Sequence, residues 1–181
     1  TFSFGSLIES NAMLETVGNE ALDFQDNVNT KLYGVSMKHQ FSKKISLIAG
    51  YNFGKTDVRA DSSSIFQDFT NVESEEKTLG IIHNNKGTKI GLLYKEPMRV
   101  TSGEVFIQVP TKKHSNGSYS FNNGWVSLSP TGKEQNFEIF IEKNLDENTK
   151  LKLNLLKRVE PYHIANSKDE DMALISFSKI F

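Results

Sequence analysis

The sequence predicts an all-β fold, an antiparallel meander of about 8–10 strands whose favoured arrangement is a closed β-barrel. Three observations support this prediction. Apolar and polar residues alternate along most of the 181-residue chain, and short polar turns separate the alternating runs. Several runs also approach the roughly 9–11 residues that a tilted strand needs to cross a bilayer. An antiparallel sandwich stays open as an alternative, because its strands have the same period of two.

The first thirty residues are expected to differ from the rest of the chain. Phe2 and Phe4 alternate with serines, which predicts a strand over residues 1–9. Residues 10–30 mix apolar, acidic and amide side chains, a composition that fits a short helix or a folded-back loop. We therefore divide the chain into residues 1–30, an N-terminal strand plus a linker or plug segment, and residues 31–181, the antiparallel β-barrel domain.

Alternation and turn chemistry place the remaining strands. Asn84-Asn85-Lys86-Gly87 is typical of a tight hairpin turn, and the polar residues 57–74 predict a long exposed loop. The predicted strands cover residues 31–41, 45–53, 77–83, 90–94, 105–109 (closed by Pro110), 119–125, 137–141, 151–155 and 173–181. Turns are expected at residues 42–44, 101–103 and 146–148, and a polar loop at residues 161–171.

Composition excludes several classes of function. A net charge of −1 and a pI near 6.4 give no overall field that would attract nucleic acid. The chain has no cysteine, which excludes a disulfide scaffold, a thiolate zinc site and a cysteine nucleophile. The four histidines are dispersed, so we expect no metal and no cofactor. The mean hydropathy of −0.42 is uninformative for barrels, whose strands alternate between lipid and lumen.

The alternating strands supply candidate residues for a lipid-facing surface and for a polar interior. The putative lipid-facing residues are Phe137, Ile139, Ile141, Leu151, Leu153 and Leu155. Charged residues alternate with them, namely Glu138, Glu142, Lys152 and Arg158, and fit either a barrel lumen or the water-exposed face of a sandwich. Aromatic residues near strand ends would form an interfacial girdle: Tyr33, Phe41, Tyr94, Trp125 and Phe181.

The C-terminal strand resembles the signal by which bacterial outer-membrane barrels are recognised for assembly. Ile175 and Phe177 alternate with serines, and the strand ends on Phe181. Lys179 departs from that signal, which usually has an apolar residue at this position.

Three further segments resemble the C-terminal region of bacterial subtilisin-like serine peptidases of the autotransporter kind. Residues 96–103 are similar to a recurring Q-P-L-R-V-x-x-G turn, through Pro97, Arg99 and Gly103. Residues 128–134 resemble L-x-P-S-G-R-E, through Pro130, Gly132 and Glu134. Residues 158–165 resemble R-x-x-P-G-H-x-A, through Pro161 and His163, with Tyr162 replacing the usual Gly.

The resemblance implies a translocator or membrane anchor in the bacterial outer membrane, with the peptidase triad in an upstream passenger domain. The chain itself is then not an enzyme, and the sequence contexts of a Ser-His-Asp site are missing. Its expected partners are outer-membrane lipid, the barrel-assembly machinery and its own passenger domain, with no nucleic acid.

Two alternatives stay open on the sequence. The chain could be a soluble periplasmic or secreted β-domain that serves as a binding or assembly module for a peptidase or for itself. A small-ligand-binding barrel would instead place Tyr51, Phe53 and Trp125 inward around a cavity.

Overall fold

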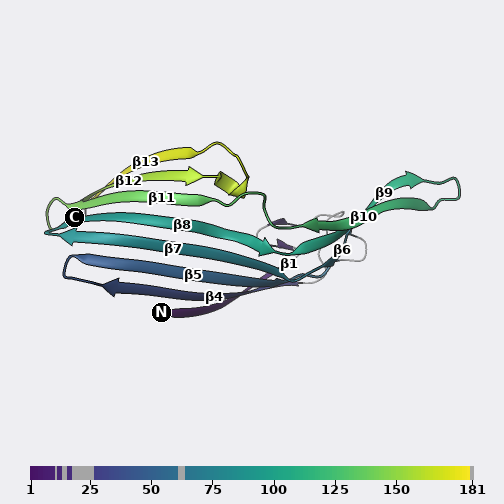
Figure 1. Ribbon diagram of the computed structural model, residues 1–181, viewed down its shortest axis with the longest axis horizontal. Coiled ribbons are helices and arrows are strands. Elements are labelled where there is room, and N and C mark those ends of the chain that lie inside the picture. The colour runs from purple at the N-terminus through teal and green to yellow at the C-terminus, as the bar shows by residue number, and fades with distance from the viewer. Residues whose placement is uncertain (11, 14–15, 18–26, 61–63, 180–181) are drawn as a thin grey trace.

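The fold is one long, curved antiparallel sheet with a second, smaller sheet projecting from one end (Figure 1). The computed structural model describes residues 1–181 except residues 11, 14–15, 18–26, 61–63 and 180–181. The main sheet contains, in spatial order, β1 (Phe2–Ser10), β4 (Asn27–Gln40), β5 (Ile45–Asp57), β7 (Val72–Asn85), β8 (Thr88–Ser102), β11 (Gln135–Asn144), β12 (Thr149–Val159) and β13 (Glu170–Lys179). The predicted all-β antiparallel meander is confirmed.

The remaining elements branch from this meander. A three-stranded sheet has the order β10-β9-β6, from β6 (Phe66–Phe69), β9 (Glu104–Lys113) and β10 (Tyr119–Ser127). The short β2 (Ala12–Met13) pairs with β3 (Thr16–Val17), and a 3₁₀ turn covers Pro161–His163. β8 pairs with β11, so the β9–β10 hairpin leaves the main sheet instead of extending it.

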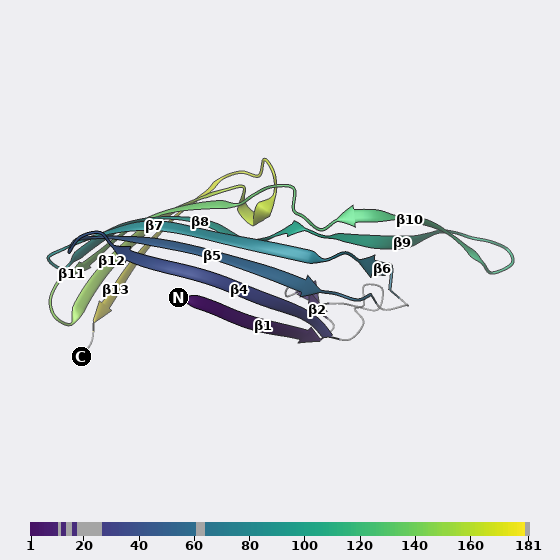
Figure 2. The ribbon, with the colours of Figure 1, turned by 60° about the horizontal axis from the view of Figure 1, so that its bottom comes forward.

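The predicted closure into a barrel is not observed within the described part of the chain. The main sheet ends at β1 on one side and at β13 on the other, and no sheet is closed. The sheet is nevertheless strongly curved (Figure 2). Period-two alternation specifies the faces of a sheet but not the number of strands or the stagger that closure requires.

Hairpin turns lie at one end of the main sheet and long connections at the other. Residues 41–44, 86–87 and 145–148 form the short turns, as predicted. Lys86 and Gly87 both have positive φ, which is the conformation that a two-residue hairpin turn requires. The longer connections follow β1, β5, β8 and β12, and these four strands end at the opposite end of the main sheet.

Two sequence predictions fail at this loop end. Residues 57–74 are not one exposed loop, because β6 lies within them and Val58 and Val72 are buried. Pro110 does not end its strand, because β9 continues to Lys113 through a bulge, where a residue without an N–H is tolerated.

The small hydrophobic core lies where the two sheets meet, not beneath the main sheet. Val28, Val58 and Val72 form its buried centre, with Phe66, Phe69, Val100 and Leu128 packed around them. Among residues 10–30, Asn27 onward already belongs to β4, and most of the predicted plug segment lies outside the described residues.

Candidate functional site

A band across one face of the main sheet is apolar from β1 to β13, and the same face carries Glu75, Lys77 and Lys157 toward the loop end. Residues that are paired in register share a face, so the pairing across the strands defines its rows. One row joins Leu47, Ile81, Leu92, Ile139, Leu155 and Ala173 from β5 to β13. We call this surface the outer apolar face; its large apolar and aromatic residues are Phe2, Phe4, Ile8, Tyr33, Val35, Met37, Ile45, Leu47, Tyr51, Phe53, Leu79, Ile81, Ile90, Leu92, Tyr94, Phe137, Ile139, Ile141, Leu151, Leu153, Leu155, Ile175 and Phe177.

The outer apolar face is largely uncovered by the protein itself. Phe137 and Ile139 are each 46% exposed, Ile141, Leu151 and Leu155 are also exposed, and Leu153 is half-buried. The accessible surface of 12193 Å² exceeds the roughly 8,800 Å² expected of a compact 20.4 kDa protein. The six residues predicted to face lipid therefore lie together on a surface that the described residues of this chain do not bury.

The height of this face can be compared with the apolar band of an outer-membrane barrel. On β5 the outward set runs from Ile45 to Phe53, eight residue steps or about 27 Å at ~3.4 Å per residue. A typical barrel tilt of about 40° reduces this length to about 21 Å, against the apolar band of ~25 Å in outer-membrane barrels. The outward apolar set of β5 is therefore somewhat shorter than that band, and on the neighbouring β7 it is shorter again, because Lys77 and Glu75 lie opposite Tyr51 and Phe53 on this face.

The opposite face is polar and crowded. Asn52 on β5 donates a hydrogen bond to Glu76 on β7 at 2.9 Å, and Lys95 on β8 pairs with Glu76 at 2.8 Å. Gly91 also lies on this face, where an added Cβ would collide with the Phe140 ring. Side chains converge on the concave side of a curved sheet, so we assign the polar face to the inside of the curvature and call it the inner face.

The charged residues that alternate with the leucines all lie on this inner face. Glu142 pairs with Lys89 at 2.9 Å, and Glu138 accepts a hydrogen bond from Asn154. Arg158 pairs with Glu170 on β13 at 2.6 Å. These contacts pair the charges of the inner face with one another, while the lysine side chains stay about half exposed.

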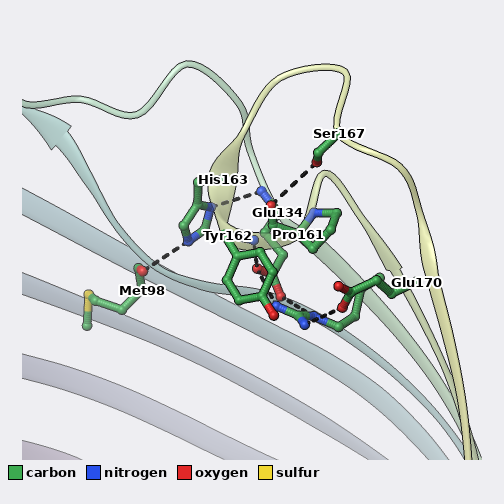
Figure 3. Close-up of polar contacts among 8 residues, drawn as sticks. Met98, Glu134, Pro161, Tyr162, His163, Ser167 and Glu170 are labelled. Carbon is green, nitrogen blue, oxygen red and sulfur yellow. Dashed lines mark hydrogen bonds and ion pairs between the residues drawn. The ribbon is translucent and has the colours of Figure 1, made fainter.

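At the loop end, Glu134 and Arg158 organise a polar cluster (Figure 3). Both guanidinium contacts are charge-assisted: Nε donates to Glu134 Oε1 at 2.9 Å and Nη2 to Oε2 at 3.0 Å. The Tyr162 backbone N–H donates to Glu134 Oε2 at 2.7 Å. Burial disfavours the charged carboxyl, but the bonds from Arg158 and Tyr162 outweigh it and lower the pKa of Glu134.

His163 connects the same cluster to β8. Its Nδ1 accepts the Glu134 backbone N–H at 2.9 Å, so the ring proton belongs on Nε2, which lies 3.2 Å from the Met98 carbonyl oxygen. Gly132 donates its N–H to the His163 carbonyl at 2.8 Å. A Cβ at Gly132 would lie 2.5 Å from the backbone N of Ala165, so only glycine fits there.

The cluster brings together residues from all three family-like segments. Gly132, Glu134, Pro161 and His163 meet there, and the Met98 carbonyl lies between Pro97 and Arg99. Tyr162, where the family pattern has Gly, has φ 61° and ψ 18°, the left-handed conformation that favours glycine. Its ring lies 4.7 Å from the Arg158 guanidinium, a stacking contact that offsets part of the backbone strain.

The other motif residues have local backbone roles. Pro97 lies in a bulge of β8 between the pairs Lys77–Glu96 and Glu75–Arg99. Gly103 has φ 141° at the junction of β8 and β9, against Val72. Pro130 is half-buried before β11. Met98 and Tyr162 were not among the predicted site residues, and Arg158 was predicted as a charged residue of the polar interior but not as the partner of Glu134.

Several sequence predictions concern residues outside this cluster. Ile175 and Phe177 lie on the outer apolar face, 70% and 62% exposed, whereas Phe181 lies outside the described residues. Trp125 is on β10, away from the main sheet, so it cannot belong to a girdle around that sheet. Tyr51 and Phe53 lie on the outer apolar face and Trp125 on the hairpin, so they do not surround a common cavity as a ligand-binding barrel would require.

Among the described residues, no group of three or more His, Cys, Asp or Glu side chains is arranged to hold a metal ion. Within the same described residues, no helix has the length and apolar character to span a membrane.

Comparison with protein-family models, with curated proteins and with solved structures finds no match for this chain.

Proposed function

We propose that this chain forms most of the wall of an outer-membrane β-barrel, whose function is to anchor or translocate an attached passenger domain without catalysis. The outer apolar face is the observation that carries the proposal. A soluble sandwich would bury such a face against a second sheet, whereas here it is continuous over eight strands and uncovered. Hydrocarbon is the surrounding that makes this exposure favourable, and the strands satisfy their backbone groups through their neighbours.

The distribution of connections supports an orientation. Outer-membrane barrels have short periplasmic turns and longer extracellular loops. By this rule, the turns at residues 41–44, 86–87 and 145–148 face the periplasm. The long connections at residues 58–71, 103–134 and 160–169, together with the Glu134 cluster, then lie at the extracellular end.

Closure into a complete barrel is part of the proposal. Because consecutive strands of the main sheet are antiparallel and eight in number, β1 and β13 run in opposite directions. Direct pairing of β1 with β13 would be antiparallel, and any strands between them must be even in number. Closure would remove both edges and enclose the inner polar face as a lumen.

The translocator role rests on the family-like segments. Their convergence on Glu134, Arg158 and His163 gives these motifs a common structural purpose, which supports the resemblance to autotransporter β-domains. Tyr162 is left-handed at a position where the family pattern has Gly, and Glu160 and His163 beside it are left-handed too, so this conformation belongs to the whole turn. In this proposal, the peptidase chemistry belongs to the passenger.

Extraction from membranes tests the proposal. The protein should partition with the outer membrane, require detergent for extraction and migrate differently on gels before and after heating. A monodisperse sample in plain buffer would refute the membrane setting and favour the soluble assembly module. An intact wild-type barrel that exposes no passenger at the cell surface would refute the translocator role alone.

A further inference from the structure

The hairpin β9–β10 projects from the loop end as a ribbon with two different faces (Figure 1). Its ten-residue strand β9 extends about 33 Å beyond Gly103 at ~3.3 Å per residue. One face bears rings from both strands, with Trp125 opposite Phe106 and Tyr119 opposite Lys113. We call this the aromatic ribbon face; it comprises Phe106, Gln108, Phe121, Asn123 and Trp125, with Tyr119 and Lys113 at its distal end.

The rings of this face are accessible and spaced as a platform. Trp125 and Phe106 have ring centroids 5.3 Å apart, and those of Tyr119 and Phe121 are 6.5 Å apart. Trp125, Phe121 and Tyr119 are each about half exposed. Gln108 and Asn123 lie opposite each other between the rings, so amide donors and acceptors alternate with aromatic surface.

The distal end of the ribbon is basic, because Lys112 and Lys113 lie there on opposite faces and residues 105–132 contain neither Asp nor Glu. At the near end, Glu104 begins β9 and Asp68 of β6 lies opposite Phe106. Lys113 lies on the aromatic ribbon face, with Nζ 5.7 Å from the Tyr119 ring centroid. An anionic group is therefore complementary to the distal end of this face, beside Lys113 and Tyr119.

We propose that the aromatic ribbon face binds the phosphate-bearing saccharide of the glycolipid in the outer leaflet. The polarised C–H groups of a sugar ring stack on aromatic faces, amides bond its hydroxyls, and lysine binds its phosphate. The position of this saccharide rests on the proposed function, because the ribbon reaches beyond the extracellular end of the apolar face. A hydrocarbon partner is disfavoured by the amides and Lys113, which lie among the rings.

The test uses Trp125, which is the only tryptophan of the chain. Deacylated lipopolysaccharide core oligosaccharide, titrated into the detergent-solubilised chain, should change the Trp125 emission saturably. Phe121→Ala and Lys113→Gln should each weaken binding about tenfold, the loss expected when one stacking or charged contact is removed. The matched controls lie on the opposite ribbon face: Val126→Ala, at the same 48% exposure as Trp125, and Lys112→Gln should change affinity less than about twofold.

Three results would overturn this proposal. They are no saturable Trp125 response to the oligosaccharide, equal affinity for its dephosphorylated form, and equal losses for Val126→Ala and Phe121→Ala. A ribbon that instead docks a protein would give the first of these results. The saccharide is soluble, so the assay requires no bilayer. If the chain inserts into membranes but does not bind the saccharide, this proposal is wrong and the proposed function is unaffected. Binding by a chain that stays monodisperse in plain buffer would refute only the proposed function.

Discussion

A charge introduced at the centre of the outer apolar face distinguishes a membrane setting from a soluble one by how much it lowers the stability of the protein. Ile139 is the middle outward residue of β11, four residue steps from Lys143 in one direction and from Gln135 in the other. In a bilayer, Ile139→Lys should destabilise the barrel by about 2–4 kcal/mol, the cost of a cation at the midplane. In water, a 46% exposed isoleucine replaced by lysine should change stability by no more than about 0.5 kcal/mol.

The same substitution near the edge of the face is the depth control. Ile45 is outward-facing and is the first residue of β5, next to a short turn, so Ile45→Lys should cost only about 0–1 kcal/mol. Equilibrium unfolding in lipid vesicles, followed by denaturant titration and by heat-modifiable gel mobility, measures both variants. The central substitution should shift the folding equilibrium about 30- to 1000-fold, since ~1.4 kcal/mol is tenfold. Equal and negligible effects at both positions would refute the assignment of this face to hydrocarbon.

Three further predictions concern the Glu134 cluster. Glu134→Gln should cost about 2–3 kcal/mol in thermal or denaturant unfolding, because Arg158 loses a bidentate partner that is only 6% exposed. The control Lys157→Gln removes an ion pair at a 48% exposed lysine and should destabilise the protein much less. Equal effects of the two substitutions would contradict the argument. The pKa of Glu134 is lower in the folded protein than its ordinary value of 4.5, so the stability that this carboxylate provides is present above pH 4.5 and is lost as the pH falls further. The free energy of unfolding, measured from pH 6 to pH 3, should show this loss. If Glu134→Gln shows the same pH dependence as the unaltered chain, this carboxyl is not the source of the loss. Tyr162→Gly should change the free energy of unfolding by less than about 1 kcal/mol, because relief of the left-handed strain compensates for the lost stacking on Arg158. Tyr162→Ala keeps the strain and should cost about 1–2 kcal/mol. If the Gly variant unfolds at a lower temperature than the Ala variant, this explanation is wrong.

The candidate faces were predictable because their chemistry is local. Phe137, Ile139 and Ile141 alternate with Glu138 and Glu142, and a strand sends alternate side chains to opposite sides. The turn at Lys86 and Gly87 was equally readable from its residue types. Neither prediction depends on which strand is the neighbour.

The Glu134 cluster was only partly predictable. Its motif residues were recognised as three separate segments, but their meeting depends on contacts such as His163 to Met98, 65 positions apart. The buried Val58 and Val72 were likewise missed within a polar stretch, because their burial comes from β6 and from the second sheet. An isolated valine between polar residues shows no alternating pattern, so the sequence does not predict that it is buried.

The sequence by itself determined that this chain is made of antiparallel strands with one apolar and one polar face, since both properties follow from the period-two geometry of each strand. Only the tertiary structure decided that β8 pairs with β11, that β9 and β10 leave the sheet as a separate ribbon, and that the apolar face is left uncovered. These choices depend on pairing energies between segments far apart in the chain. The bulges of β8 and the positive φ of Gly103 redirect the strand at the point where the ribbon departs.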